Sequence, residues 1–281
     1  MAADGTKKKR GAKPDLATIG GLLLAMVGIV GGLILEGGKI QDISQVTAAL
    51  IVLGGTIGAV MVTSPMHVLI GAAKKFGLVF FDKGHSSSHL IEEIIEYANK
   101  GRKSGIVSLE DDLERVSDPF LKKALSLAVD GMELQQLRDM MELQLSQDEK
   151  RGEAEAKVFE AAGGYAPTIG IIGAVMGLIQ VMKHLEDISA VGHGIAVAFV
   201  ATVYGVGVSN ILFLPAAAKI KARLHHDIEA RELMLEGVCG ILEGLNPKLI
   251  RSKLEAFLDT GAGGKKGAKG AKEAVSEPAS V

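Results

Sequence analysis

Four long stretches of the chain contain no Asp, Glu, Lys or Arg. They cover residues 16–35, 43–66, 161–182 and 188–218. The hydrocarbon core of a bilayer is about 30 Å thick and needs about 20 helical residues to cross it, so each stretch is long enough. Lipid offers the backbone no hydrogen-bond partner, and a helix is therefore the expected conformation. The pattern predicts membrane helices over residues 16–36, 45–64, 164–184 and 194–216.

A charged insert, about 66–160, separates the second stretch from the third. Its apolar residues recur at helical spacing, as in the run from Leu90 to Ala98. The sequence Ser108-Leu109-Glu110-Asp111 places a hydroxyl before two acids, which predicts a helix start capped by Ser108. The run 147–160 is rich in charge and poor in apolar residues, which predicts a solvated helix leading into the third span.

The part of the chain after the fourth stretch falls into two segments. Residues 219–258 predict a further amphipathic helical region, with a break at Asn246-Pro247. Residues 259–281 are of low complexity and predict disorder.

The fold class that follows is an all-α integral membrane protein, with four transmembrane helices and a helical cytoplasmic domain. The predicted divisions are a basic cytoplasmic tail at 1–15, a hairpin of transmembrane helices 1 and 2 at 16–64, a cytoplasmic helical domain at 65–160, transmembrane helices 3 and 4 at 161–217, a cytoplasmic helical region at 218–258 and a disordered tail at 259–281.

Composition agrees with a membrane protein whose helices pack closely. Hydrophobic residues make up 48% of the chain and the mean hydropathy is +0.29. The 36 glycines suit membrane helices that approach one another at short distance. Glycines four residues apart predict such packing within one chain or between copies, at Gly28/Gly32, Gly54/Gly58 and Gly173/Gly177.

Basic residues lie on one side of the predicted spans. They precede the first span, follow the second and follow the fourth: Lys7, Lys8, Lys9, Arg10 and Lys13; Lys74, Lys75 and Lys83; Lys219, Lys221 and Arg223. The short connections near 37–44 and 184–193 contain Lys39 and almost no other basic residue. The positive-inside rule therefore places both termini and the insert in the cytoplasm. The first stretch is longer than the apolar region of a signal peptide, which favours a retained helical hairpin.

The four stretches contain no carboxylate. Proton and sodium transporters usually carry an ionisable group inside the membrane, so ion conduction here requires a titrating group from another chain. The intramembrane polar set consists of Thr168, Gln180, Thr202, Tyr204, Ser209 and Asn210, with His184 and His193 at the outer edge. A hydroxyl such as that of Thr202 could line the path of that group, or could bond back to a helix carbonyl.

No residue pattern indicates an enzyme, a metal site or a cofactor. Cys239 is the single cysteine and lies in an apolar run, which favours a packed core residue. His225-His226-Asp227 lacks further ligands, so a solvated helix face is the favoured interpretation. A nucleophile constellation and a phosphate loop are absent from the sequence, and no nucleic-acid partner is expected.

Two prolines lie near the cytoplasmic ends of the third and fourth spans. Pro167 could be an ordinary helix-start signal, since proline is common in the first turn. Pro215 lies late in a helical pattern and should break or kink the helix. Their matching depth gives the alternative hypothesis of a hinge.

Three motifs resemble the MotA/PomA family of flagellar stator subunits. The run APTIGIIGAVMGL at 166–178 resembles the third span of that family, and ATVYG at 201–205 with Leu214-Pro215 resembles the fourth. RKSGIVSLE at 102–110 resembles its charged cytoplasmic segment. The resemblance covers about residues 16–258, and the motifs occur in the family's order.

This resemblance implies a multi-pass subunit of the bacterial inner membrane that generates torque. It implies a homopentamer around two copies of a single-span MotB or PomB partner, which is anchored to peptidoglycan and carries a membrane aspartate. The turning pentamer would drive the rotor protein FliG. The roles implied are rotor contact for Arg102, Lys103, Glu110 and Asp111, an ion-path or partner-facing position for Thr202, Ala174 and Tyr204, and conformational change for Pro167 and Pro215.

The transported ion is expected to be the proton. Sodium-driven members of the family typically have Thr at the position of Ala174, and a methyl group cannot ligate sodium as a hydroxyl can. Two other functions compete with the stator hypothesis: a proton-driven energiser of outer-membrane transport of the ExbB or TolQ type, and a self-sufficient ion transporter. The N-terminal hairpin and the 102–110 segment favour the stator over the first, and the carboxylate-free spans disfavour the second.

Overall fold

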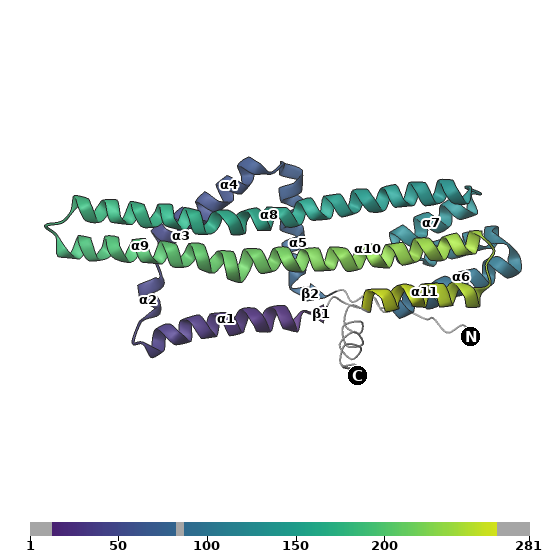
Figure 1. The fold of residues 1–281 in the computed structure, drawn as a ribbon, viewed down its shortest axis with the longest axis horizontal. Coiled ribbons are helices and arrows are strands. Elements are labelled where there is room, and N and C mark those ends of the chain that lie inside the picture. Colours follow the sequence, from purple (N-terminus) through teal and green to yellow (C-terminus); the bar gives the residue numbers. More distant parts are fainter. Residues whose placement is uncertain (1–12, 83–86, 263–281) are drawn as a thin grey trace, which may run out of the picture. The chain divides into compact units, whose positions relative to one another are not determined.

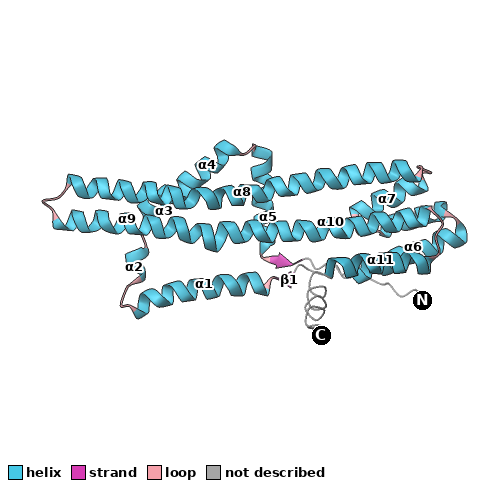
Figure 2. Ribbon diagram, viewed as in Figure 1, coloured by secondary structure: helices cyan, strands magenta, loops and turns pink. Residues whose placement is uncertain are grey.

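The computed structural model describes residues 13–82 and 87–262, which are almost entirely helical (Figures 1 and 2). It divides into two compact units. Met1–Gly84 with Glu149–Leu224 is here named the span unit, and His85–Asp148 with His225–Val281 the insert unit. Most of the predicted tail at 1–15 and residues 263–281 of the predicted disordered tail lie outside the described residues. Residues 259–262, the start of that predicted disordered tail, are helical in the structure.

The N-terminal half of the span unit contains the first two apolar segments. Its elements are β1 (Lys13–Pro14), α1 (Leu16–Leu35), α2 (Ile40–Ile43), α3 (Val46–Ala49), the π-helical turn η1 (Leu50–Gly54), α4 (Gly55–Thr63), α5 (Met66–Val79) and β2 (Phe81–Asp82). The strands pair antiparallel, with Pro14 opposite Phe81. The second predicted span is thus a continuous helical stack, α3–η1–α4, that contains one π-helical turn.

The last two spans belong to helices that are much longer than the membrane requires. They are α8 (Leu134–Lys183), α9 (Ile188–Val208), the π-helical turn η3 (Ser209–Phe213) and α10 (Leu214–Leu242). The fourth helix begins at Ile188, and not at the predicted residue 194, because Asp187 caps it. The Asp187 carboxylate accepts from the backbone N–H groups of Ser189 and Ala190 at 2.9 and 3.2 Å.

The charge pattern predicted a solvated helix leading into the third span. In the structure, only part of this helix surface is exposed to solvent. One face of α8 is buried in a cluster that also includes residues of α4, α5 and α10: Val60, Ala72, Val79, Ala156, Val158, Phe159, Ala162, Ala216, Ala217 and Ile220. The structure therefore groups α5 and residues 149–160 with the spans, whereas the sequence placed that division at 65 and 160. Packing at helical spacing outweighs the high charge of this segment.

The insert unit is a bundle of short helices around the ends of α8 and α10. Its other elements are α6 (Ser87–Ser104), the 3₁₀ helix η2 (Ile106–Arg115), α7 (Pro119–Val129) and α11 (Pro247–Ala262). The break at Asn246-Pro247 is confirmed, since α10 ends at Leu242 and α11 begins at Pro247. The predicted helix start at Ser108 is wrong: η2 begins at Ile106, and Ser108 Oγ donates to the Gly105 carbonyl at 2.6 Å.

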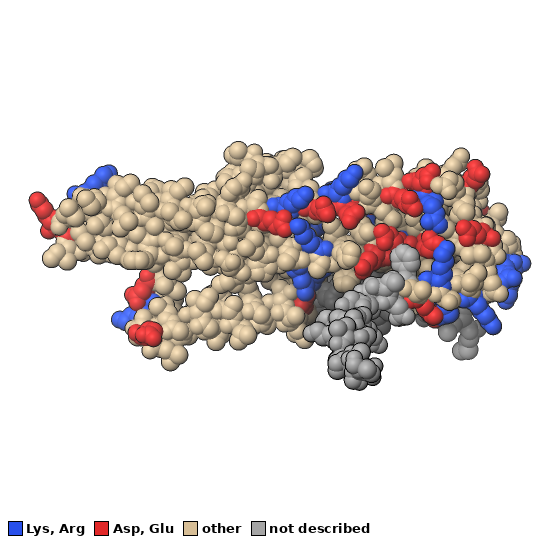
Figure 3. Space-filling view, viewed as in Figure 1, with Lys and Arg blue, Asp and Glu red and all other residues tan. Residues whose placement is uncertain are grey.

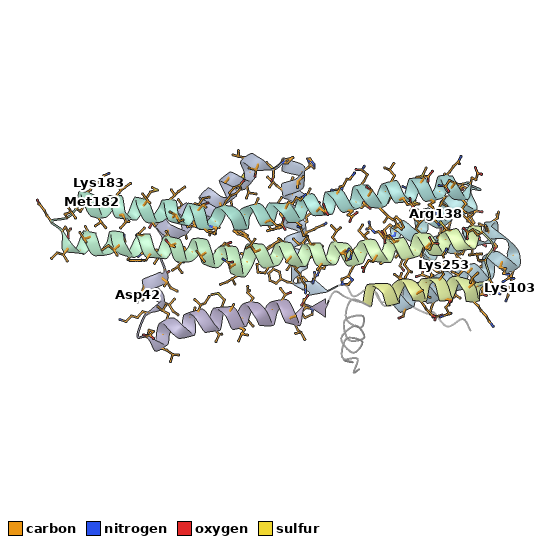
Figure 4. All side chains as sticks on the ribbon, in the orientation of Figure 1. Asp42, Lys103, Arg138, Met182, Lys183 and Lys253 are labelled. Carbon is orange, nitrogen blue, oxygen red and sulfur yellow. The ribbon has the colours of Figure 1, made fainter. Side chains whose placement is uncertain are left out.

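Ion pairs hold α11 onto this bundle. Arg251 makes two charge-assisted bonds to Glu92 of α6, at 2.6 and 2.7 Å. Glu236 of α10 pairs with Lys253 and with Arg138, both labelled in Figure 4, the latter at 3.1 Å. Burial raises the pKa of Glu236, but the two cations outweigh burial and hold that pKa below its usual value.

Candidate functional site

A seam of small residues joins α8 to α9 in the span unit. A Cβ atom added to Gly205 would lie 2.6 Å from the Ala166 carbonyl oxygen, and one added to Gly170 would lie 2.9 Å from that of Ala201. Near the other end of the seam, a Cβ on Gly177 would lie 2.7 Å from the Gly194 carbonyl oxygen. The two backbones are therefore in direct contact. Figure 2 shows α8 and α9 running beside each other.

The other predicted glycine pairs make no such contact. Gly28, Gly32, Gly54 and Gly58 have open space where a Cβ would be, whereas Gly173 packs against Ala201 and Ile51. The spacing of four residues could not tell which glycine pair contacts a helix of the same chain, because such a pair permits close packing with any neighbouring helix.

Several residues implicated in ion passage lie along this seam. Pro167 lies opposite Gly205, and Thr202 lies opposite Gly170. Thr202 Oγ1 donates to the Ala198 carbonyl at 3.2 Å, which is the back-bonded arrangement. Ala174 lies between Gly173 and Gly177 on α8 and is half-buried.

Tyr204 of α9 bonds to the start of the second span. Its hydroxyl donates to the Ile43 carbonyl at 2.5 Å and accepts from the backbone N–H of Gln45 at 3.3 Å. The ring is half-buried beside a small cluster of Ala48, Val52, Val200 and Ala201. Tyr204 thus ties the start of the second span to the fourth.

Two buried hydroxyls stand out in the spans. Ser209 Oγ donates to the Gly163 carbonyl at 2.6 Å and joins η3 to α8. Among the described residues, Thr56 Oγ1 is buried without a hydrogen-bond partner, with 1% of the residue exposed. Sequence reasoning omitted Thr56, although it lies four residues from both Val52 and Val60 on the apolar face of the second span.

The two prolines occupy different helical settings. Pro167 lies deep inside α8, so the interpretation as an ordinary helix start is wrong. Pro215 does not end the helix either. It follows η3, where the Leu214 N–H donates to the Ser209 carbonyl over five residues. A π-helical turn accommodates a residue that lacks an N–H and clashes with the preceding turn, so the chain continues directly into α10.

The span segments of α8 and α9 carry no charged side chain. Their visible surface in Figure 3 is free of Lys, Arg, Asp and Glu up to the turn where α8 meets α9. Lys183, labelled in Figure 4, marks the end of α8 at that turn.

The residues implicated in rotor contact lie together in the insert unit. Arg102 and Lys103 form the last turn of α6, and Glu110 and Asp111 lie on η2. Gly105 joins the two elements with φ of 82°, a conformation that glycine adopts without strain. All four side chains are exposed, and within the described part of the chain none has an ion-pair partner. Lys100 and Asp112 pair at 2.6 Å and fix η2 against α6.

These features define a class: a helical protein whose described residues include four apolar helices long enough to cross a membrane. The chain belongs to the motility protein A family. Its residues 19–104 match the family model for the motility protein A N-terminal region, and residues 112–233 match that of the MotA/TolQ/ExbB proton channel family. It is 37% identical to motility protein A of Bacillus subtilis over 87% of this chain and 91% of that protein. It is 34% identical to chemotaxis protein PomA of Vibrio alginolyticus over 88% and 96%.

Solved structures agree with this assignment. The fold is similar to a chain of the C. jejuni MotAB structure, with a TM-score of 0.82 and 33% identity over 86% of this chain and 95% of that one. It is also similar to a chain of the flagellar MotAB stator complex from Bacillus subtilis, with a TM-score of 0.79 and 37% identity over 85% and 94%. The predicted all-α membrane fold is confirmed, and the match over the first two spans separates the chain from the energiser hypothesis.

Proposed function

We propose that this chain is the stator subunit of a bacterial flagellar motor, and that it uses the flow of ions through the inner membrane to turn the rotor. The observation that carries the proposal is the pairing of a motility protein A fold with spans that contain no carboxylate. A titrating group must then come from a second chain. The MotAB composition of both similar structures supports a MotB-type partner with a membrane acid.

The assembly that follows is a ring of copies of this chain around the partner. We infer a pentamer around two single-span partner chains, anchored to peptidoglycan, with both termini and the insert unit in the cytoplasm. Such a subunit is a component of a motor and not an enzyme. The small-residue seam keeps α8 and α9 together as one element, and the turn at η3 and Pro215 is the place where that element can bend.

Torque would reach the rotor protein FliG through the insert unit. Arg102 and Lys103, together with Glu110 and Asp111, are exposed charges on two adjoining elements and have no described partner that would neutralise them. Exposed ion pairs contribute only about 0–1 kcal/mol, so these charges suit recognition more than stability.

Charge reversal tests this proposal. We expect Arg102→Glu and Glu110→Lys to impair swimming because they oppose the charges that the rotor presents. The amount of protein in the membrane should stay unchanged, because both side chains are exposed. Arg115→Glu, an exposed change at the far end of η2, is the matched control. Normal swimming of both variants would remove the rotor-contact assignment, and normal swimming of a deletion strain would remove the stator function.

The ion that we propose is the proton. Ala174 presents a methyl group on α8, where a hydroxyl could have offered an oxygen ligand for sodium. The partner's acid then carries the proton, and Thr202, whose hydroxyl donates to the Ala198 carbonyl, stays the proposed hydroxyl beside that acid's path.

A further inference from the structure

Asp15, directly before the first membrane helix, is an almost completely buried carboxylate. Only 7% of the residue is exposed. Its Oδ1 accepts from the Thr18 N–H at 3.1 Å and so caps α1. Its Oδ2 pairs with Lys219 at 2.6 Å and with Arg223 at 2.9 Å, both on α10.

Arg223 extends this contact to a third segment. Its Nη1 donates to the backbone carbonyl of Phe81 at 2.8 Å and also to that of Leu78. The backbone N–H of Asp15 donates to the Phe80 carbonyl at 2.9 Å, beside the pairing of β1 with β2. The guanidinium of Arg223, on α10, thus joins this helix to the start of α1 and to the end of α5. The fixed fork of donors that arginine offers suits several contacts at once.

The first membrane helix has little else to hold it to the chain. The described α1 buries no side chain, and positions 20, 21, 28, 31 and 32 are glycines with open space around them. The contacts that join α1 to the rest of the chain are therefore concentrated at its N-terminal end, at Asp15 and β1.

Lys219 and Arg223 stand four and eight residues after Pro215, on the same face of α10. Pro215 follows the π-helical turn η3, the irregular point of this helix. A change in direction at η3 would move both cations, and with them Asp15 and α1.

We propose that Asp15, Lys219 and Arg223 form a coupling clamp that transmits movement of α10 at Pro215 to α1 and to the end of α5. The inference rests on the proposed stator function. The three are positioning residues: none of them lies on the apolar seam, and their task is to make three segments move together. The cations and the cap also hold the pKa of Asp15 well below its usual range, so the clamp stays charged at physiological pH.

Four variants test the clamp. Asp15→Asn keeps the shape and removes the charge. Arg223→Lys keeps the charge and removes the fork. Arg223→Asp places a second negative charge beside Asp15. The double variant Asp15→Arg with Arg223→Asp restores an ion pair with the two charges exchanged. Lys221→Gln is the matched control, because Lys221 lies on the same helix but pairs with Glu160 near the surface, where both side chains are about two-fifths exposed.

The readouts are the membrane level of the chain, copurification of the MotB-type partner, and torque per engaged stator unit from the steps of a tethered bead. We expect Asp15→Asn and Arg223→Lys to keep the first two and to lose torque per unit severalfold. Arg223→Asp should lose rotation, the reversed pair should regain part of it, and Lys221→Gln should behave as the unmodified protein.

Two results would overturn the clamp: full torque per unit in Asp15→Asn, or a torque loss that only mirrors a loss of protein from the membrane. Failure of the proposed function itself is a separate result, since a deletion strain would then swim normally.

Discussion

At the scale of single residues, the seam between α8 and α9 gives the sharpest prediction. Gly205→Ala should destabilise the span unit by about 1–3 kcal/mol, because the new methyl would meet the backbone at Ala166 and cannot displace it easily. The measurement is thermal unfolding in detergent. Gly207→Ala on the same helix is the control, because a Cβ there meets nothing within 4 Å. Equal unfolding temperatures for the two variants would contradict direct backbone contact at the seam.

The single cysteine gives a second prediction at this scale. Cys239 is fully buried in the insert unit, and burial raises the pKa of its thiol. The reactive thiolate is therefore scarcer than in a free cysteine at pH 8, and the sulfur is inaccessible. We expect maleimide to leave the native chain unlabelled and to label it after denaturation. Ser252→Cys, at an exposed position of α11, should label at once. Rapid native labelling of Cys239 would show that the insert unit opens readily.

At the scale of elements, Glu155 shows how α5 is joined to α8. Its side chain is 5% exposed and pairs with Lys75 at 2.8 Å and with Arg151 at 3.5 Å. It packs so closely on Gly71 that a Cβ there would collide with its carboxylate. A side chain at position 71 would therefore force the Glu155 carboxylate to shift from this position.

Replacement of Glu155 by Gln should lower the free energy of unfolding by about 1–3 kcal/mol, because charge-assisted hydrogen bonds in a buried setting are lost. Thermal unfolding in detergent measures the effect. Lys221→Gln breaks an ion pair whose two side chains are 43% and 42% exposed, so it should cost only about 0–1 kcal/mol. A Glu155→Gln variant as stable as Lys221→Gln would mean that the carboxylate is solvated.

The sequence predicted where the helices lie along the chain better than it predicted which residues they pack against. The four spans could be predicted because runs without charge suffice to identify a membrane helix. Segment 147–160 was misjudged, because its few apolar residues form one buried face that a count of charges does not reveal. The pairing of Asp15 with Arg223 joins residues about 200 positions apart, and no local pattern carries that information.

The candidate site shows the same division between local and distant information. Exposure of Arg102 and Glu110 follows from their own charge, and the structure places them on adjoining elements. The setting of Pro167 inside a helix of 50 residues could not be read from a first-turn preference. Tyr204 was predicted to face the ion path, but which groups its hydroxyl meets depends on the packing of α9 beside the second span.

At the scale of the whole molecule, the described chain is a scaffold without the acid that its membrane chemistry needs. The spans supply close packing and an irregular helical turn before Pro215, and the insert unit supplies exposed charges. The proposed proton carrier belongs to another chain. Ion specificity is then set by whether the pathway offers oxygen ligands beside that carrier. At Ala174 this chain offers a methyl group.

Swimming speed should therefore be independent of external sodium. We expect cells to swim equally fast when sodium is replaced by potassium at constant pH and ionic strength, because a proton needs no ligand at position 174. A protonophore should stop them in both media. The potassium medium controls for ionic strength, and speed per cell, measured by tracking, is the readout. Speed that rises with sodium at fixed pH, and survives the protonophore while a sodium gradient remains, would mean that other oxygens of the pathway bind sodium.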